Sequence, residues 1–126
     1  MPAELPALTA VRQFAMALPE VTERLSHGSP TFFIRGKKTF VTFVDDHHGD
    51  GIIGIWCAAP PGAQAQLVEH EPDRFFSPPY VGGRGWLGVR LDRSFDRVEL
   101  AAIITDAYVC VAPKTLATLV RPSAPD

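Results

Sequence analysis

Cysteine is scarce in this sequence, with only Cys57 and Cys110 among 126 residues. The two form no CxxC motif and neither has a histidine beside it, so their spacing gives no zinc site. Two cysteines cannot build the dense disulfide framework of a small secreted domain, and the low count fits a reducing compartment. We therefore expect a cytoplasmic protein.

Long apolar runs are absent as well. No segment approaches the roughly 18 apolar residues that a membrane-spanning helix needs. The opening Met1-Pro2-Ala3-Glu4 has no basic region followed by an apolar stretch, which a secretory signal would have. We expect a protein that is neither exported nor inserted into a membrane.

The third absence is an excess of positive charge. The chain has 12 lysines and arginines against 14 aspartates and glutamates, which gives a net charge of −2 and a pI near 6.0. Nucleic-acid-binding domains usually carry a clear basic excess, because their affinity depends on releasing counterions from phosphates. A local basic patch can still bind phosphates, since the field depends on where charges lie, but that binding is modest and salt-sensitive.

The residues that are present suit one globular core. Hydrophobic residues make up 46% and charged residues 21% of the chain, which is ordinary for a folded domain. The length matches one domain better than two. We expect a single domain over residues 1–126, with a frayed tail at 121–126.

Apolar periodicity predicts the helices. Residues 9–18 and 63–71 have helical spacing, and 21–29 could hold one further helical turn. An Asp-x-x-Glu pattern at 96–99 is typical of a helix start, and it precedes an apolar stripe. That stripe consists of Val98, Ala101, Ile104, Tyr108 and Val111. Pro113 is placed to open a final short helix.

Strands are predicted at 31–34, 39–44 and 52–57, with two more beginning at 75 and 86. A basic turn, Arg35-Gly36-Lys37-Lys38, joins the first two into a hairpin. In the last strand, alternation places Leu87, Val89 and Leu91 toward the core and Trp86 and Arg90 toward solvent. The order α-β-β-β-α-β-β-α predicts an α+β fold, a two-layer α/β sandwich whose antiparallel sheet has helices on one face.

No catalytic motif emerges from the polar residues. The loop 45–50, with two histidines and three aspartates, could bind Zn or Ni, but it lacks a second ligand cluster, so a solvated acidic loop is favoured. Cys57 or Cys110 could be a nucleophile with His27 or His70, but no motif supplies an oxyanion hole. The glycines at 82–85 precede no helix that would complete a phosphate cradle. We expect no enzyme activity, no metal and no cofactor.

Basic and aromatic residues give the strongest candidate site. Lysine and arginine on projecting loops can hold phosphates, and an aromatic ring can stack on a base. Ordinary solvated turn residues are the alternative interpretation. The candidates for nucleic-acid binding are Arg35, Lys37, Lys38, Tyr80, Arg84, Trp86, Arg90 and Lys114.

Several stretches together resemble the MmcQ/YjbR family, in the family's order over roughly residues 10–120. They are Leu25-Ser26-His27-Gly28, the run from Phe33 to Phe40, the run from Trp56 to Gly62, the run from Phe75 to Trp86, and Ala112-Pro113-Lys114. The resemblance implies a two-layer fold with an antiparallel sheet, similar in topology to type III secretion chaperones. It also implies DNA binding through a "double-wing" motif, whose wings would be the turn 35–38 and the loop with Arg84 and Trp86. It supplies no catalytic residue and no ligand set.

Three functional hypotheses follow. The first is a non-enzymatic DNA-binding protein whose Arg35, Lys37, Lys38 and Arg84 contact phosphates while Trp86 or Tyr80 stacks. The second is a protein-interaction or chaperone-like module that uses the open sheet face or self-associates. The third is a small-molecule or metal-dependent enzyme that uses His27 or the loop 45–50.

Overall fold

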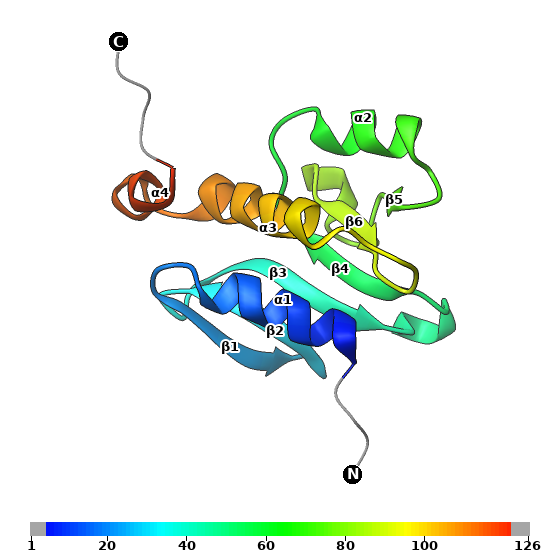
Figure 1. Cartoon of the computed structure of the whole chain (residues 1–126), viewed down its shortest axis with the longest axis horizontal. Coiled ribbons are helices and arrows are strands. Elements are labelled where there is room, and N and C mark those ends of the chain that lie inside the picture. Colours follow the sequence, from blue (N-terminus) through cyan, green and yellow to red (C-terminus); the bar gives the residue numbers. More distant parts are fainter. Residues whose placement is uncertain (1–4, 122–126) are drawn as a thin grey trace.

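An antiparallel sheet of six strands forms the centre of the fold, and four α-helices pack around it (Figure 1). The structure is a computed structural model that describes residues 5–121. In chain order the elements are α1 (Pro6–Met16), β1 (Val21–Ser26), β2 (Ser29–Ile34), β3 (Lys38–Asp45), the 3-10 turn η1 (His47–Gly49), β4 (Ile53–Cys57), α2 (Ala63–His70), β5 (Phe75–Phe76), the 3-10 turn η2 (Gly82–Arg84), β6 (Leu87–Arg90), α3 (Arg97–Val111) and α4 (Lys114–Val120).

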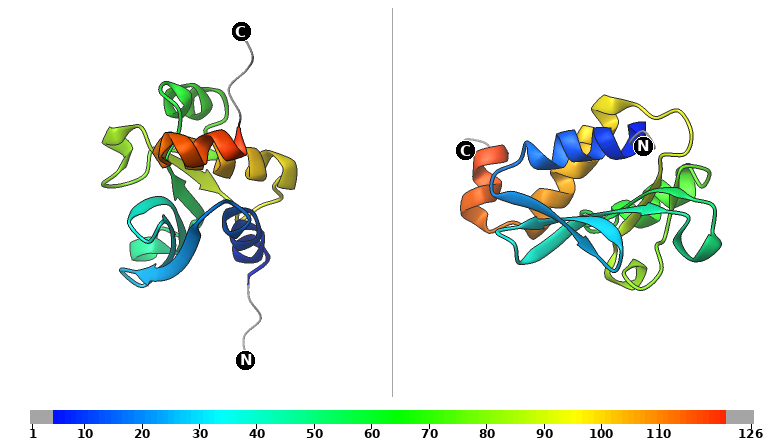
Figure 2. Two further views of the ribbon diagram at one scale, coloured as in Figure 1. Left: turned by 90° about the vertical axis from the view of Figure 1, so that its left-hand side faces the viewer. Right: turned by 90° about the horizontal axis from the view of Figure 1, so that it is seen from below.

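The strands pair in the order β1-β2-β3-β4-β6-β5, each antiparallel to its neighbours. Helices α1 and α3 lie side by side over one face of this sheet (Figures 1 and 2). The segment between β5 and β6 lies on the opposite side of the sheet from them (Figure 2, right). The predicted α+β class, with an antiparallel sheet covered by helices, is confirmed.

The prediction of a helical turn at 21–29 is wrong, because this segment forms β1 and the turn into β2. Ser26 pairs with Ser29, so only His27 and Gly28 form the loop. Both have positive φ, 52° and 80°. That pattern belongs to the type I′ turn, whose twist matches a two-residue β-hairpin. The two turn residues therefore favour a β-hairpin over a helical turn. The observed element order has one strand more than the predicted order.

A β-bulge in β3 places two adjacent side chains on the helical side of the sheet. Phe32 pairs with Val41 and Phe33 with Thr39, so Phe40 is the extra residue. Phe40 and Val41 are both fully buried, and the Phe40 ring meets Tyr108 of α3 edge-to-face at 5.5 Å. Because a bulge interrupts the alternation of side chains, it leaves the threonines on either side of this pair, Thr39 and Thr42, on the other face.

Helix α3 begins where the sequence predicts. The Asp96 carboxylate accepts hydrogen bonds from the backbone N–H groups of Val98 and Glu99, at 2.8 and 3.1 Å. The predicted stripe is partly wrong, because Val98 is 80% exposed. The buried residues are Leu100, Ile104, Ala107 and Tyr108, a set with i, i+4, i+7, i+8 spacing.

The predicted inward residues Leu87 and Val89 of β6, and Leu91 directly after it, are confirmed as buried. The prediction that Trp86 faces solvent is wrong, since only 8% of it is exposed. Trp86 lies just before the strand begins, so the alternation of the strand does not determine its environment.

No helix within residues 5–121 combines the length and the apolar character that crossing a bilayer requires. The final short helix predicted after Pro113 is confirmed as α4. Of the tail predicted at 121–126, residues 122–126 lie outside the described part of the chain.

Candidate functional site

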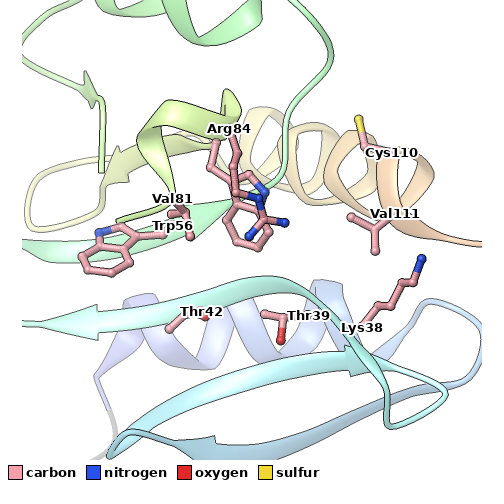
Figure 3. A pocket seen from close by; sticks show the side chains of 9 residues that line it. Lys38, Thr39, Thr42, Trp56, Val81, Arg84, Cys110 and Val111 are labelled. Atoms are coloured by element: carbon pink, nitrogen blue, oxygen red, sulfur yellow. The ribbon is translucent and has the colours of Figure 1, made fainter. Parts of the chain in front are cut away.

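A pocket of about 610 Å³ opens where β3 extends past the end of β4. Cys57, the last residue of β4, pairs with Val41, so the first residues of β3 have no partner from β4. The segment 81–86 and the C-terminal end of α3 border this gap (Figure 3). Its lining residues are Lys38, Thr39, Thr42, Trp56, Val81, Arg84, Trp86, Cys110 and Val111.

The charge in this pocket is of one sign. Among residues 5–121, Lys38 and Arg84 are its only charged lining residues, and no ion pair joins either of them to a carboxylate. The guanidinium of Arg84 lies 5.5 Å from the centre of the Trp86 ring, within cation–π range. Thr39 and Thr42 add two hydroxyl groups. An anion entering this pocket would meet two cations and no carboxylate.

The loop that carries Arg84 is held by a side chain of α2. The amide nitrogen of Gln64 donates to the carbonyl oxygens of Gly82, at 2.9 Å, and of Trp86. A Cβ at Gly82 would collide with the Ser77 hydroxyl, so the loop also closes tightly on its own start. These contacts fix the η2 turn, and with it Arg84, against the sheet.

An aromatic cluster lies at the other end of the pocket. The His47 ring meets Trp56 edge-on at 4.8 Å, and Tyr80 lies 6.5 Å from Trp56. Tyr80 is 79% exposed and has a φ of 67°, an uncommon value for a residue with a side chain. The indole N–H of Trp56 and the Nε2 of His47 are buried without a hydrogen-bond partner within residues 5–121. The expected solvated loop 45–50 therefore contributes one half-buried histidine to this cluster.

The structure brings three of the eight predicted site residues into the pocket, namely Lys38, Arg84 and Trp86, and places Tyr80 next to it. Trp86 lies in the wall and is buried, so its ring is not free to stack on a base. Lys37 is exposed in the turn between β2 and β3.

The other three predicted residues lie outside the pocket. Arg35 bonds to Glu20 at 3.1 Å on the surface, and Arg90 pairs with Asp92 at 2.9 Å. The hydrogen bond from Arg90 lowers the pKa of the Asp92 carboxyl below its usual range. Lys114 is the first residue of α4 and does not line the pocket.

Six residues of the pocket wall were not predicted as site residues: Thr39, Thr42, Trp56, Val81, Cys110 and Val111. Thr39 and Thr42 fall on one face only because of the bulge at Phe40. In the sequence, Trp56 looks like an ordinary apolar strand residue. The strand register would have placed it beside Thr42, because the two residues pair and cross-strand partners share a face.

The two free cysteines differ in environment. Cys57 is fully buried, which raises its thiol pKa to about 12. Cys110 is exposed at the pocket, and partial burial together with Asp106 raises its pKa above the ordinary 9.0. Neither thiol is therefore activated as a nucleophile. Within residues 5–121 no cluster of three or more histidine, cysteine, aspartate or glutamate side chains is placed to hold a metal ion.

The acidic loop and the basic turn lie at opposite ends of β3. Lys38 and Asp45 are the first and last residues of the eight-residue strand β3, which places their Cα atoms roughly 23 Å apart. The Debye length at physiological salt is about 8 Å. The acidic loop therefore reduces the potential at Lys38 only weakly, and it borders the opposite end of the pocket, where His47 contacts Trp56.

Comparisons with known proteins agree with this fold. The chain matches the YjbR family over residues 16–110. The crystal structure of Deinococcus radiodurans protein DR2400, which carries a DUF419 domain, is similar with a TM-score of 0.72 and 16% identity. The similarity covers 97% of this chain and 96% of that one. A search of curated proteins finds no match. Since the family match extends over most of the chain, this protein belongs to the YjbR family.

Proposed function

We propose that this protein is a cytoplasmic, non-enzymatic DNA-binding protein. The observation that carries the proposal is that Lys38 and Arg84, from two distant segments of the chain, line one pocket to which residues 5–121 contribute no carboxylate. Basic side chains without acidic partners are the elements that hold phosphates. In this proposal the two wings are the turn between β2 and β3 and the loop between β5 and β6.

The geometry narrows the set of DNA contacts. Lys37, Lys38 and Arg84 are the phosphate contacts in this proposal, because Arg35 and Arg90 already pair with carboxylates. Tyr80 is the stacking residue, since it is exposed, whereas Trp86 is buried and supports Arg84. Three phosphate contacts give weak, salt-sensitive binding, with a slope of log K against log salt of about −2 to −3.

Fluorescence anisotropy of a labelled DNA oligonucleotide tests this proposal. Affinity should fall roughly 20- to 40-fold between about 50 and 200 mM salt. Lys38→Ala or Arg84→Ala should weaken binding and reduce the salt slope by about one. Arg93→Ala removes the same charge from the exposed loop before α3, outside the pocket lining, and should leave binding unchanged.

No binding at about 50 mM salt, where phosphate contacts are strongest, would reject DNA as the ligand. Equal losses in the Arg84→Ala and Arg93→Ala proteins would show that only the overall charge matters. That result would show that DNA does not bind through the pocket.

Self-association through β1 is the second proposal, and one observation favours it. β1 is an open edge of the sheet, and its Leu25 is 69% exposed. Unpaired edge strands can add a strand from another chain. Light scattering after size-exclusion chromatography should then show a dimer that Leu25→Lys dissociates. A strict monomer over a wide concentration range would exclude this arrangement.

A further inference from the structure

We infer that the pocket between β3, the segment 81–86 and the end of α3 is a specific site for a phosphate monoester joined to a planar ring, as in a nucleoside monophosphate. Two sources offer this chemistry: a free mononucleotide, and the phosphorylated end of a DNA strand. For the strand end the inference rests on the proposed function, whereas for the free nucleotide it stands alone.

Size and charge support a small ligand held inside the pocket. A volume of about 610 Å³ lies within the range of roughly 300 to 1,000 Å³ typical of small-molecule sites. The charge of a phosphate monoester at neutral pH, about −1.5 to −2, matches the two cations Lys38 and Arg84. The phosphodiester of a strand interior carries one negative charge and would leave one of these cations uncompensated.

The positions of the two cations define where the phosphate lies. Figure 3 shows Lys38 at one end of the pocket and Arg84 in its middle, with Thr39 near them along β3. A guanidinium gives a phosphate two parallel donors, and a lysine adds a mobile point charge. The hydroxyl groups of Thr39 and Thr42 supply further donors along the same wall. No other lining residue among those at 5–121 is charged, so none of them competes with the phosphate for Lys38 and Arg84.

The remaining wall suits a planar ring. Trp56 lies at the opposite end of the pocket from Lys38 (Figure 3). Tyr80 lies beside Trp56, with 6.5 Å between the two ring centres, and is 79% exposed. Stacking of a base on this exposed ring is favourable and tolerates different bases.

The nearby carboxylate that could oppose an anion is already paired. Asp106 lies close enough to Cys110 to raise its pKa. Asp106 accepts an ion pair from Arg121 at 2.7 Å and does not line the pocket. The pocket therefore keeps its positive character although the whole chain has a net charge of −2.

Cys110 provides a direct readout, because it lines the pocket while Cys57 is fully buried. We would measure alkylation of Cys110 near pH 9, with and without deoxyadenosine monophosphate. The nucleotide should slow the reaction in a saturable way. Deoxyadenosine, which lacks the phosphate, and inorganic phosphate, which lacks the ring, should each protect at least about tenfold less well, since each loses one set of contacts.

Two variants test whether Lys38 and Arg84 bind the phosphate. Lys38→Gln and Arg84→Gln should each raise the nucleotide concentration needed for half-protection by about tenfold. Arg93→Gln is the matched control and should not change it. Circular dichroism of each variant would verify that the fold is retained, which the exposure of Lys38 and Arg84 favours.

Short oligonucleotides distinguish the two possible ligands, the free mononucleotide and the phosphorylated strand end. If the ligand is a strand end, a 5′-phosphorylated oligonucleotide protects Cys110 at a lower concentration than the mononucleotide, and the same strand with a 5′-hydroxyl does not. If the ligand is a free nucleotide, the mononucleotide protects best. Either pattern supports the site.

The experiments distinguish a failure of this inference from a failure of the proposed DNA binding. DNA binding that depends on Arg84, without protection of Cys110 by any phosphate monoester, overturns this inference and leaves the proposed function standing. Nucleotide protection without DNA binding rejects the proposed function only. Equal protection by nucleotide, nucleoside and phosphate would show adventitious occupancy and would overturn the site.

Discussion

The side-chain amide of Gln64 donates a hydrogen bond of 2.9 Å to the carbonyl oxygen of Gly82, and so connects α2 to the loop that carries Arg84. The same nitrogen also donates to the Trp86 carbonyl. One side chain thus holds both ends of the segment that forms a wall of the pocket. The position of a binding residue here depends on a helix that does not itself line the pocket.

Replacement of Gln64 by alanine should loosen this loop. Loss of these two contacts should lower the free energy of unfolding by about 1–3 kcal/mol, which is the net value of two ordinary hydrogen bonds. Urea denaturation would measure the change. Gln66→Ala is the matched control, because Gln66 is exposed on the same helix, and its stability should change little.

Tyr108→Phe should destabilise the protein without changing its shape. The Tyr108 hydroxyl donates a 2.7 Å hydrogen bond to the carbonyl of Pro19 and joins α3 to the segment before β1. Because Tyr108 is fully buried, removal of its hydroxyl leaves the Pro19 carbonyl without this partner. The free energy of unfolding should fall by about 1–3 kcal/mol. Thermal unfolding would detect this loss. Tyr80→Phe, at a residue that is 79% exposed, should unfold at the wild-type temperature.

Gly54→Ala should disrupt the pairing of β4 with β6. A Cβ at Gly54 would collide with the backbone carbonyl of Val89, which cannot move aside as a flexible side chain could. We expect a loss of about 1–3 kcal/mol, typical of overpacking. Gly83→Ala is the control, since a Cβ there has no neighbour within 4 Å. Equal stability of the two variants would contradict the register of β4 and β6.

Thiol titration should find one reactive cysteine in the folded protein. Cys110 should react slowly at neutral pH and faster as the pH rises toward and above 9, because its raised pKa keeps it protonated at lower pH. Cys57, with a pKa of about 12 and full burial, should react only after denaturation. Cys110→Ser should abolish the native reaction. Two reactive thiols in the native protein would contradict the burial of Cys57.

Part of the fold could be predicted because local patterns coincide with the tertiary environment. The alternation of Leu87, Val89 and Leu91 predicts a buried strand face, and Asp96 predicts the start of α3. Both predictions depend on interactions within a few residues. The misread segment 21–29 also had a local signal, the His27-Gly28 pair, which favours a two-residue hairpin turn.

The candidate site was only partly predictable. Basic and aromatic residues on two loops indicate an anion-binding surface, and Lys38 and Arg84 were among them. The sequence does not show that Lys38 and Arg84 line one pocket while Arg35 and Arg90 pair with carboxylates. These ion pairs depend on side-chain geometry in the folded protein. The burial of Trp86 likewise follows from the packing of the segment 81–86 against the sheet.

The α+β class, most of the elements and the basic character of the two loops could be predicted, since these depend on periodicity, turn residues and composition. Two features of the site depend on tertiary contacts instead: the bulge at Phe40 turns Thr39 and Thr42 to one face, and β3 extends past the end of β4, where the pocket opens. Register and strand length arise from contacts between segments far apart in the chain, and no single segment encodes them.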